Sequence, residues 1–79
     1  MVSATKIAEH MEVVGSDGQH VGTVDHMEGS GQIKLTKQDA SSGGQHHLIP
    51  LAWVESVEDR RVRLLKPAAE AMRSWKQTM

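Results

Sequence analysis

Short runs in which apolar and polar residues alternate recur along this chain, and such alternation is typical of half-buried β-strands. The clearest run covers residues 32–37, where Ile33 and Leu35 would face one side of a strand and their polar neighbours the other. Residues 61–65 repeat the pattern. Because turn residues separate the runs at short intervals, the sequence predicts a sandwich or barrel rather than a βαβ unit.

Glycines mark the first hairpin and an irregularity in its second strand. Asp17-Gly18 follows the apolar strand residues 11–14, and this dipeptide tolerates the positive φ angles of a tight turn. In the next run, residues 20–28, apolar side chains recur at every third position rather than every second. Gly22 lies within this run, so a strand with a bulge is favoured over a helix.

Residues 46–51 predict another strand, with His47 on its inward face. We expect His46 to be exposed, and the ring of His47 to be hydrogen-bonded at the rim of the fold. Pro50 has no backbone N–H to donate, so this segment should lie at a sheet edge or end there.

Two further segments differ in character. Residues 38–45 are polar and contain two adjacent glycines, which predicts the most mobile internal loop. Residues 53–57 predict a short fifth strand, which ends at a turn at Glu58-Asp59.

Pro67 would lie in the first turn of a C-terminal helix, where its fixed φ angle is favourable. Ala68, Met72 and Trp75 recur at helical spacing and form an apolar stripe along residues 67–77. We expect this stripe either to cover one end of the β-domain or to contact a second copy of the chain.

These elements predict a single domain over residues 1–79. Its fold class is mostly β: a small barrel of about five or six short antiparallel strands over residues 11–65, with a short C-terminal helix over residues 67–77. A barrel closes the edges of its own sheet, which is economical for a chain of 79 residues.

The composition limits both the core and the chemistry. Phe and Tyr are absent, so aliphatic side chains and Met must fill the core. Cysteine is absent too, which fits a reducing compartment. No apolar run approaches the roughly 20 residues of a membrane span, and residues 1–6 do not resemble a secretory signal. We therefore expect a cytoplasmic protein.

Charge is unevenly distributed, although the formal net charge is only −1. Five acidic residues lie within residues 1–28, and six basic residues lie within residues 60–76. Attraction between the two ends of the chain is the simpler interpretation. A basic patch for an anionic partner is the alternative.

Two segments carry a resemblance to a known family. Residues 13–24 (Val-Val-Gly-Ser-Asp-Gly-Gln-His-Val-Gly-Thr-Val) resemble the opening of a PRC-barrel domain, with a strand, an acidic-Gly turn and a second strand. Residues 48–54 are similar to the Ile-Pro strand of that family, and residues 62–64 to its last strand. The resemblance implies a PRC-type barrel and a non-catalytic module that binds a protein or RNA, or self-associates.

A narrower resemblance rests on three dipeptides. Asp17-Gly18, taken with His46-His47 and Trp53-Val54, is similar to short bacterial proteins grouped as domain of unknown function 2171. PRC barrels also occur in a ribosome maturation factor, which implies RNA or ribosome binding as a second possibility.

The five histidines raise the question of a metal site. A transition metal needs three or four ligands around one ion, whereas the adjacent His46 and His47 point to opposite faces of a strand. The acidic residues lie in predicted turns or at exposed positions, and no nucleophile stands beside a base. We expect no metal, no cofactor and no catalytic residue, and therefore not an enzyme.

These observations predict a non-catalytic module for protein–protein interaction or self-association, with an unidentified protein or a second copy as its partner and no membrane. The alternative is an RNA-binding or ribosome-associated module that uses the basic C-terminal strand and helix. The near-zero net charge makes nucleic acid the less favoured partner. The expected interaction surface consists of His46, His47, Trp53, Arg61, Arg63, Met72 and Trp75.

Overall fold

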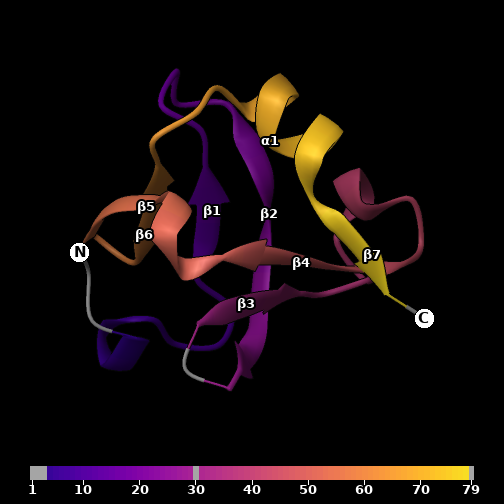
Figure 1. The fold of residues 1–79 in the computed structure, drawn as a ribbon, viewed down its shortest axis with the longest axis horizontal. Coiled ribbons are helices and arrows are strands. Elements are labelled where there is room, and N and C mark those ends of the chain that lie inside the picture. Colours follow the sequence, from indigo (N-terminus) through magenta and orange to yellow (C-terminus); the bar gives the residue numbers. More distant parts are fainter. Residues whose placement is uncertain (1–3, 30, 79) are drawn as a thin grey trace.

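Strands dominate the computed structural model, which describes residues 4–29 and 31–78 (Figure 1). They are β1 (Glu12–Val14), β2 (His20–Glu28), β3 (Gln32–Leu35), β4 (His46–Pro50), β5 (Val54–Glu58), β6 (Arg61–Leu64) and β7 (Lys76–Thr78). The helical elements are the 3-10 turns η1 (Ala4–Lys6), η2 (Ala40–Ser42) and η3 (Leu51–Trp53) and the helix α1 (Ala68–Ser74). The predicted mostly β class with a short C-terminal helix is confirmed.

The strands form one sheet in the order β5-β6-β1-β2-β3-β4-β7. β1 runs parallel to β6, whereas the other neighbouring strands are antiparallel, so the β1–β6 pair departs from the antiparallel arrangement that the sequence predicts. β5 and β7 lie at the two ends of this order, and within the described residues no pairing joins them. The sheet is therefore mixed and open in its strand pairing.

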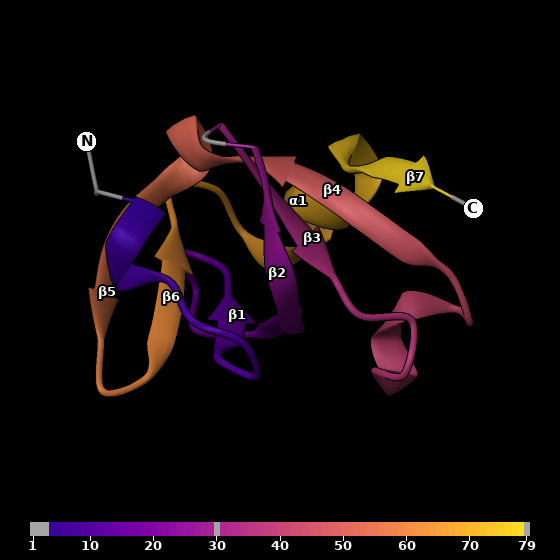
Figure 2. The ribbon, with the colours of Figure 1, turned by 90° about the horizontal axis from the view of Figure 1, so that it is seen from below.

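β2 links the two halves of the sheet. Its first half pairs with β1, and its second half pairs with β3. The register shifts once on each side: it passes over Val21 in the pairing with β1 and over Asp25 in the pairing with β3. Bulges bend a strand, so the predicted strand with an irregularity near Gly22 is confirmed. Figure 1 shows β4 running across the direction of β1 and β2, and Figure 2 shows the curved sheet from below.

The core lies where the curved sheet, η1 and α1 enclose aliphatic side chains. Alternation places every second residue of β3, β4 and β6 inward, as the sequence pattern predicts. The buried cluster consists of Ile7, Val13, Val21, Val24, Ile33, Leu35, Ile49, Leu51, Val54, Val62, Leu64, Ala68 and Ala71. Because these side chains are small, the fold depends on close approach of its elements rather than on large aromatic anchors.

The C-terminal helix is shorter than predicted. It ends at Ser74 instead of continuing to residue 77, and Trp75 takes an extended conformation with φ −68° and ψ 157°. Residues 76–78 then form β7, which pairs antiparallel with β4. The pairing satisfies backbone groups of β4 that a longer helix would leave at an open edge.

The turn between β1 and β2 is fastened to the start of α1. The N–H of Ser16 donates to the carbonyl of Lys66 at 2.9 Å, and the Asp17 carboxylate accepts the N–H of Ala68 at 3.3 Å. Asp17 also accepts the N–H of Gln19 at 3.2 Å, as its predicted turn role requires. Asp17 therefore stabilises both the hairpin turn and the helix N-terminus.

Candidate functional site

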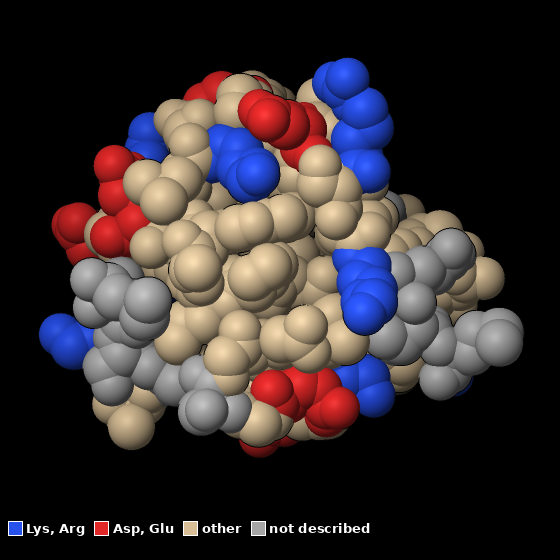
Figure 3. Space-filling view, in the orientation of Figure 1, with Lys and Arg blue, Asp and Glu red and all other residues tan. Residues whose placement is uncertain are grey.

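A broad face without charged side chains covers the centre of the molecule in Figure 3, over η3 and β4, and Lys, Arg, Asp and Glu lie around its margin, including the region of α1. We call it the uncharged face. η3 and β4 contribute the partly buried residues Leu48, Pro50 and Trp53. Leu48 and Pro50 lie on the side of β4 opposite its buried residues. Interface cores are depleted of charge, so this face has the composition of a contact surface.

Trp53 packs partly against the core and also meets a cation. The Lys66 ammonium lies over its ring, 4.4 Å from the centroid. The N–H of Leu65 donates to the carbonyl of Trp53 at 2.7 Å, which places Leu65 beside η3. Leu65 is 59% exposed. A large apolar side chain left this open next to a tryptophan extends the apolar surface around η3.

Trp75 stacks on His47, with ring centroids 3.8 Å apart and an interplanar angle of 15°. Met72 and Trp75 both pack against the core from α1 and its end. The stripe predicted along the helix therefore docks on its own sheet. Ala71 is buried as well, which the predicted stripe did not include.

The two adjacent histidines point to opposite faces of β4, and His47 is buried as predicted, but the hydrogen bond expected for His47 is made by His46 instead. His46 is only partly exposed, and its Nδ1–H donates to the carbonyl of Leu35 at 3.1 Å. His47 is 4% exposed, and no described residue offers its Nδ1 a hydrogen bond. Burial lowers the pKa of His47, and the charge of neighbouring His46 lowers it further. His47 is therefore a neutral ring that stacks rather than a hydrogen-bonded one.

Arg61 and Arg63 are exposed on β6 and already have acceptors within the chain. Arg61 Nε donates to Glu12 at 3.2 Å, which joins the acidic and basic ends of the sequence. Arg63 donates through Nη2 to the Ser16 carbonyl at 2.7 Å, and its Nε lies 3.6 Å from Glu55. The simpler interpretation of the charge asymmetry, mutual attraction of the two ends, is thus supported for this strand pair.

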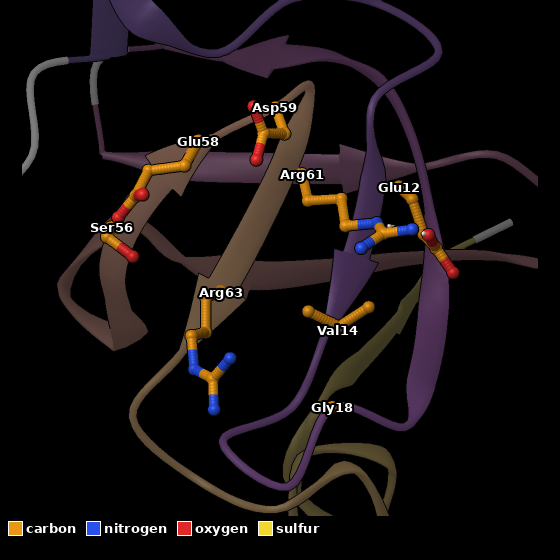
Figure 4. A pocket seen from close by; sticks show the side chains of 8 residues that line it. All are labelled: Glu12, Val14, Gly18, Ser56, Glu58, Asp59, Arg61 and Arg63. Carbon is orange, nitrogen blue, oxygen red and sulfur yellow. Dashed lines mark hydrogen bonds and ion pairs between the residues drawn. The ribbon is translucent and has the colours of Figure 1, made fainter.

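Both arginines line a shallow pocket of about 330 Å³ between β1, β5 and β6 (Figure 4). Its lining carries both signs of charge: Glu12, Val14, Gly18, Ser56, Glu58, Asp59, Arg61 and Arg63. Three carboxylates against two guanidinium groups give a formal charge of −1. This balance disfavours a polyanion such as a nucleic acid at this site.

The sequence-predicted surface residues do not form one patch. Arg61 and Arg63 share the pocket in Figure 4, and His47 contacts Trp75. Trp53 instead has Lys66 over its ring. The expected interaction surface is therefore divided among at least three local environments.

Sequence reasoning missed a group of polar side chains around His20. Its Nδ1 lies 3.0 Å from Glu12 Oε2, and its Nε2 lies 2.8 Å from Asp39 Oδ2. Thr23 donates its hydroxyl to the same Asp39 oxygen at 2.6 Å. No local sequence pattern predicts this group, because its members come from β1, β2 and the loop after β3.

The pKa values of the group follow from these contacts. Burial alone would lower the pKa of His20, but hydrogen bonds to Asp39 and Glu12 and their charges outweigh it and raise the pKa. The hydrogen bond with His20 lowers the pKa of Glu12. Each shift favours the charged form of its residue.

A second pocket, of about 430 Å³, adjoins this group. Thr23 and Asp39 form part of its lining, together with His10, Val24, Asp25, Thr36, Lys37, Gln38 and His46.

Among the described residues, no three His, Asp or Glu side chains are placed to hold a metal ion. The same part of the chain contains no helix long and apolar enough to cross a membrane.

A protein-family model matches most of the chain. The model of a family described as "Uncharacterized protein conserved in bacteria (DUF2171)" matches residues 7–72. This segment spans β1 to β6 and most of α1. No curated protein matches the chain.

Proposed function

The chain belongs to the DUF2171 family of bacterial proteins, and we propose that it is a non-catalytic binding module that associates with a protein partner or with a second copy of itself. The uncharged face is the observation that carries this proposal. It combines partly buried apolar residues with a charged margin, which is the anatomy of a protein–protein interface.

Lysine side chains flank the apolar part of the uncharged face. Leu48 lies between Lys76 of β7 and Lys34 of β3 in the cross-strand register. These lysines would place a charged rim beside the apolar centre. Such a rim favours specific orientation over non-specific aggregation.

RNA binding is supported less well by the geometry. Arg61 and Arg63 hold acceptors within the chain, so phosphate contacts would have to compete with Glu12 and the Ser16 carbonyl. Stacking of bases would require open aromatic faces. Lys66 covers one tryptophan and His47 stacks on the other.

A PRC-type relationship belongs to the same proposal. The residues that carry the resemblance form the end of β1, the turn at 15–18, the first half of β2, the end of β4 with η3 and the start of β5, and most of β6. They fix the positions of the central strands and not those of the surface. An experimental structure that superposes these strands on PRC barrels, with β5 and β7 brought together, would support closure into a barrel.

The test replaces Leu48, on the uncharged face, and Leu65, beside η3, with serine. Leu48→Ser and Leu65→Ser should each weaken association about tenfold, equivalent to about 1.4 kcal/mol. Gln38→Ser, at an exposed position in the loop, is the matched control and should leave association unchanged. Sedimentation equilibrium over a range of protein concentrations measures self-association.

The outcomes separate the two kinds of partner. A wild-type chain that stays monomeric at high concentration excludes self-association, and capture of a bacterial protein by wild type and Gln38→Ser, but not by Leu48→Ser, then supports a partner. If Leu48→Ser captures the same protein as the wild type, and the wild type is monomeric, the uncharged face is not the binding surface. Retention on RNA that falls steeply with salt would favour the RNA-binding alternative.

A further inference from the structure

His20 lies between two carboxylates that come from different parts of the chain. Glu12 belongs to β1, and its Oε2 is 3.0 Å from Nδ1. Asp39 belongs to the loop between β3 and β4, and both its oxygens are within 2.9 Å of Nε2. The histidine side chain is 40% exposed, whereas the Asp39 side chain is 8% exposed. The ring therefore bridges the sheet and an inserted loop carboxylate.

Only the protonated ring can satisfy both contacts. A neutral imidazole has one N–H, so one nitrogen would direct its lone pair at a carboxylate less than about 3 Å away. The imidazolium donates from both nitrogens and carries a charge opposite to both acceptors. The geometry thus favours the protonated ring, and histidine is the side chain whose proton is lost closest to neutral pH.

The charges around the ring balance only when it is protonated. Glu12 and Asp39 face it from β1 and from the loop, and Arg61 on β6 binds the other oxygen of Glu12. Thr23, on the same strand as His20, donates to Asp39 and holds it in place. Two cations then oppose two carboxylates. Deprotonation leaves one uncompensated negative charge in the group.

We propose that His20 is a proton-controlled clamp that fastens the loop 36–45 onto the sheet when it is charged and releases the loop when it is neutral. The Thr23 hydroxyl on β2 also holds Asp39, and the N–H of Thr36 donates to the Thr23 carbonyl at 2.9 Å, so loss of the clamp loosens the loop beyond Thr36 rather than detaching it. Ser42 donates its hydroxyl to the Lys37 carbonyl at 2.7 Å, which is a contact within the loop and does not tie it to β1 or β2. Loss of the clamp would also change the second pocket, because Thr23, Gln38 and Asp39 line it.

Linkage gives the size of the effect. If closing the clamp raises the pKa of His20 by one, loss of the proton weakens closure about tenfold. The pKa of His20 is indeed raised, against the opposing effect of burial, by its hydrogen bonds to Asp39 and Glu12. The loop should therefore be more ordered below that pKa than above it.

The experiment is an NMR titration of the whole chain between pH 5 and 9. Ring resonances report the titration of His20, and backbone relaxation with heteronuclear NOEs reports the order of residues 38–45. We expect His20 to titrate above the ordinary value of 6.5, and the loop to become mobile across the same midpoint. Residues of β3 should remain rigid throughout.

Three variants make the result specific. Asp39→Asn keeps the shape of the carboxylate but removes its charge, so the titration of His20 should move down and the loop should be mobile at every pH. His20→Gln cannot ionise and should abolish the pH dependence. His26→Gln is the control, because the contacts of His26 are with Asp25 and Glu28 on its own strand.

Two results would overturn the clamp. One is a His20 midpoint at or below 6.5, and the other is loop relaxation that does not change across the His20 midpoint. Both are measured on the wild-type chain, so neither depends on a variant that folds poorly. Neither outcome bears on the uncharged face, which uses different residues.

Discussion

At the scale of single residues, Gly15 shows how closely two elements approach. A Cβ placed on Gly15 would lie 2.9 Å from the Ala68 Cα and closer still to the Ala68 backbone nitrogen. Backbone atoms cannot move aside as a flexible side chain can. Glycine is required here because the β1–β2 turn packs directly on the start of α1.

Gly15→Ala should therefore destabilise the fold by about 1–3 kcal/mol, the usual cost of overpacking. Gly31→Ala is the matched control, since a Cβ there would meet no atom within 4 Å. Chemical denaturation with a common m-value measures both. Equal midpoints for the two variants would show that the turn and α1 are not in contact.

Arg60 occupies a conformation that suits glycine. Asp59 and Arg60 have φ angles of 51° and 61° between β5 and β6, a pair of positive values typical of a two-residue type I′ hairpin turn. Left-handed backbone costs a residue with a side chain about 1 kcal/mol or more. The sequence predicts a turn here, but Glu-Asp-Arg-Arg does not reveal its type.

Arg60→Gly should stabilise the protein by roughly 0.5 kcal/mol, because relief of the backbone is partly offset by greater freedom of glycine in the unfolded chain. Arg60→Ala removes the same charge but keeps the Cβ, so it should give no gain. Thermal denaturation compares the two. A gain of similar size in Arg60→Ala would assign the effect to charge instead.

A local sequence pattern predicts some features of the candidate-site residues and not others. Alternation alone correctly places His46 and His47 on opposite faces of β4. It could not show that His47 would stack on Trp75, because that contact depends on how the chain returns after α1. The His20 group was missed for the same reason, since Glu12 and Asp39 lie 8 and 19 residues away.

At the scale of elements, the end of α1 shows the limit of helical periodicity. Ala68, Met72 and Trp75 fit a continuous stripe, and the sequence contains no glycine or proline after residue 67 to stop a helix. Pairing with β4 decides the outcome, because β7 satisfies backbone groups of that strand. Tertiary hydrogen bonding overrides a helical pattern that is only about three turns long.

Trp75→Ala should test how much this closing segment contributes. The ring packs on the core and on His47, so its loss should cost about 2 kcal/mol, less than for a fully buried tryptophan. For a domain of this size the melting temperature should fall by about 10 °C. Trp75→Phe retains a ring for stacking and should recover most of the loss.

Melting of Trp75→Ala at several protein concentrations also shows whether Trp75 packs on its own chain or contacts a second copy. A fall in melting temperature that is independent of protein concentration means that Trp75 stabilises its own chain. A fall that appears only at high concentration places it in a contact between copies. Unchanged melting in Trp75→Ala would contradict both roles.

At the scale of the whole molecule, the strand order was the least predictable feature. The alternating runs located β3, β4 and β6 correctly, but alternation does not say which strands become neighbours. The parallel pairing of β1 with β6 joins residues 49 apart, such as Glu12 and Arg61. The opposite charges of the two chain ends were its one signal in the sequence.

The stability of the whole chain should depend on pH through groups that act in opposite directions. The pKa of His20 is raised by Asp39 and Glu12, although burial opposes the shift, so its contribution is complete below pH 6.5. It is lost as the pH rises from 6.5 through the folded-state pKa. Burial lowers the pKa of His47, so its contribution is complete above pH 6.5 and is lost as the pH falls below that value.

These two histidines together predict a stability maximum near pH 6.5, with a decline on both sides. The lowered pKa of Glu12, caused first by its hydrogen bond to His20, adds a further loss as the pH falls below 4.5. Urea denaturation at intervals between pH 4 and 9 measures the profile.

His20→Gln should flatten the alkaline limb alone, because it removes the group whose proton is lost there. His47→Phe keeps the stack on Trp75 and should flatten the limb just below pH 6.5. A wild-type profile that rises steadily from pH 6 to 9 would contradict the charged bridge between Glu12 and Asp39, since that bridge must weaken once His20 loses its proton.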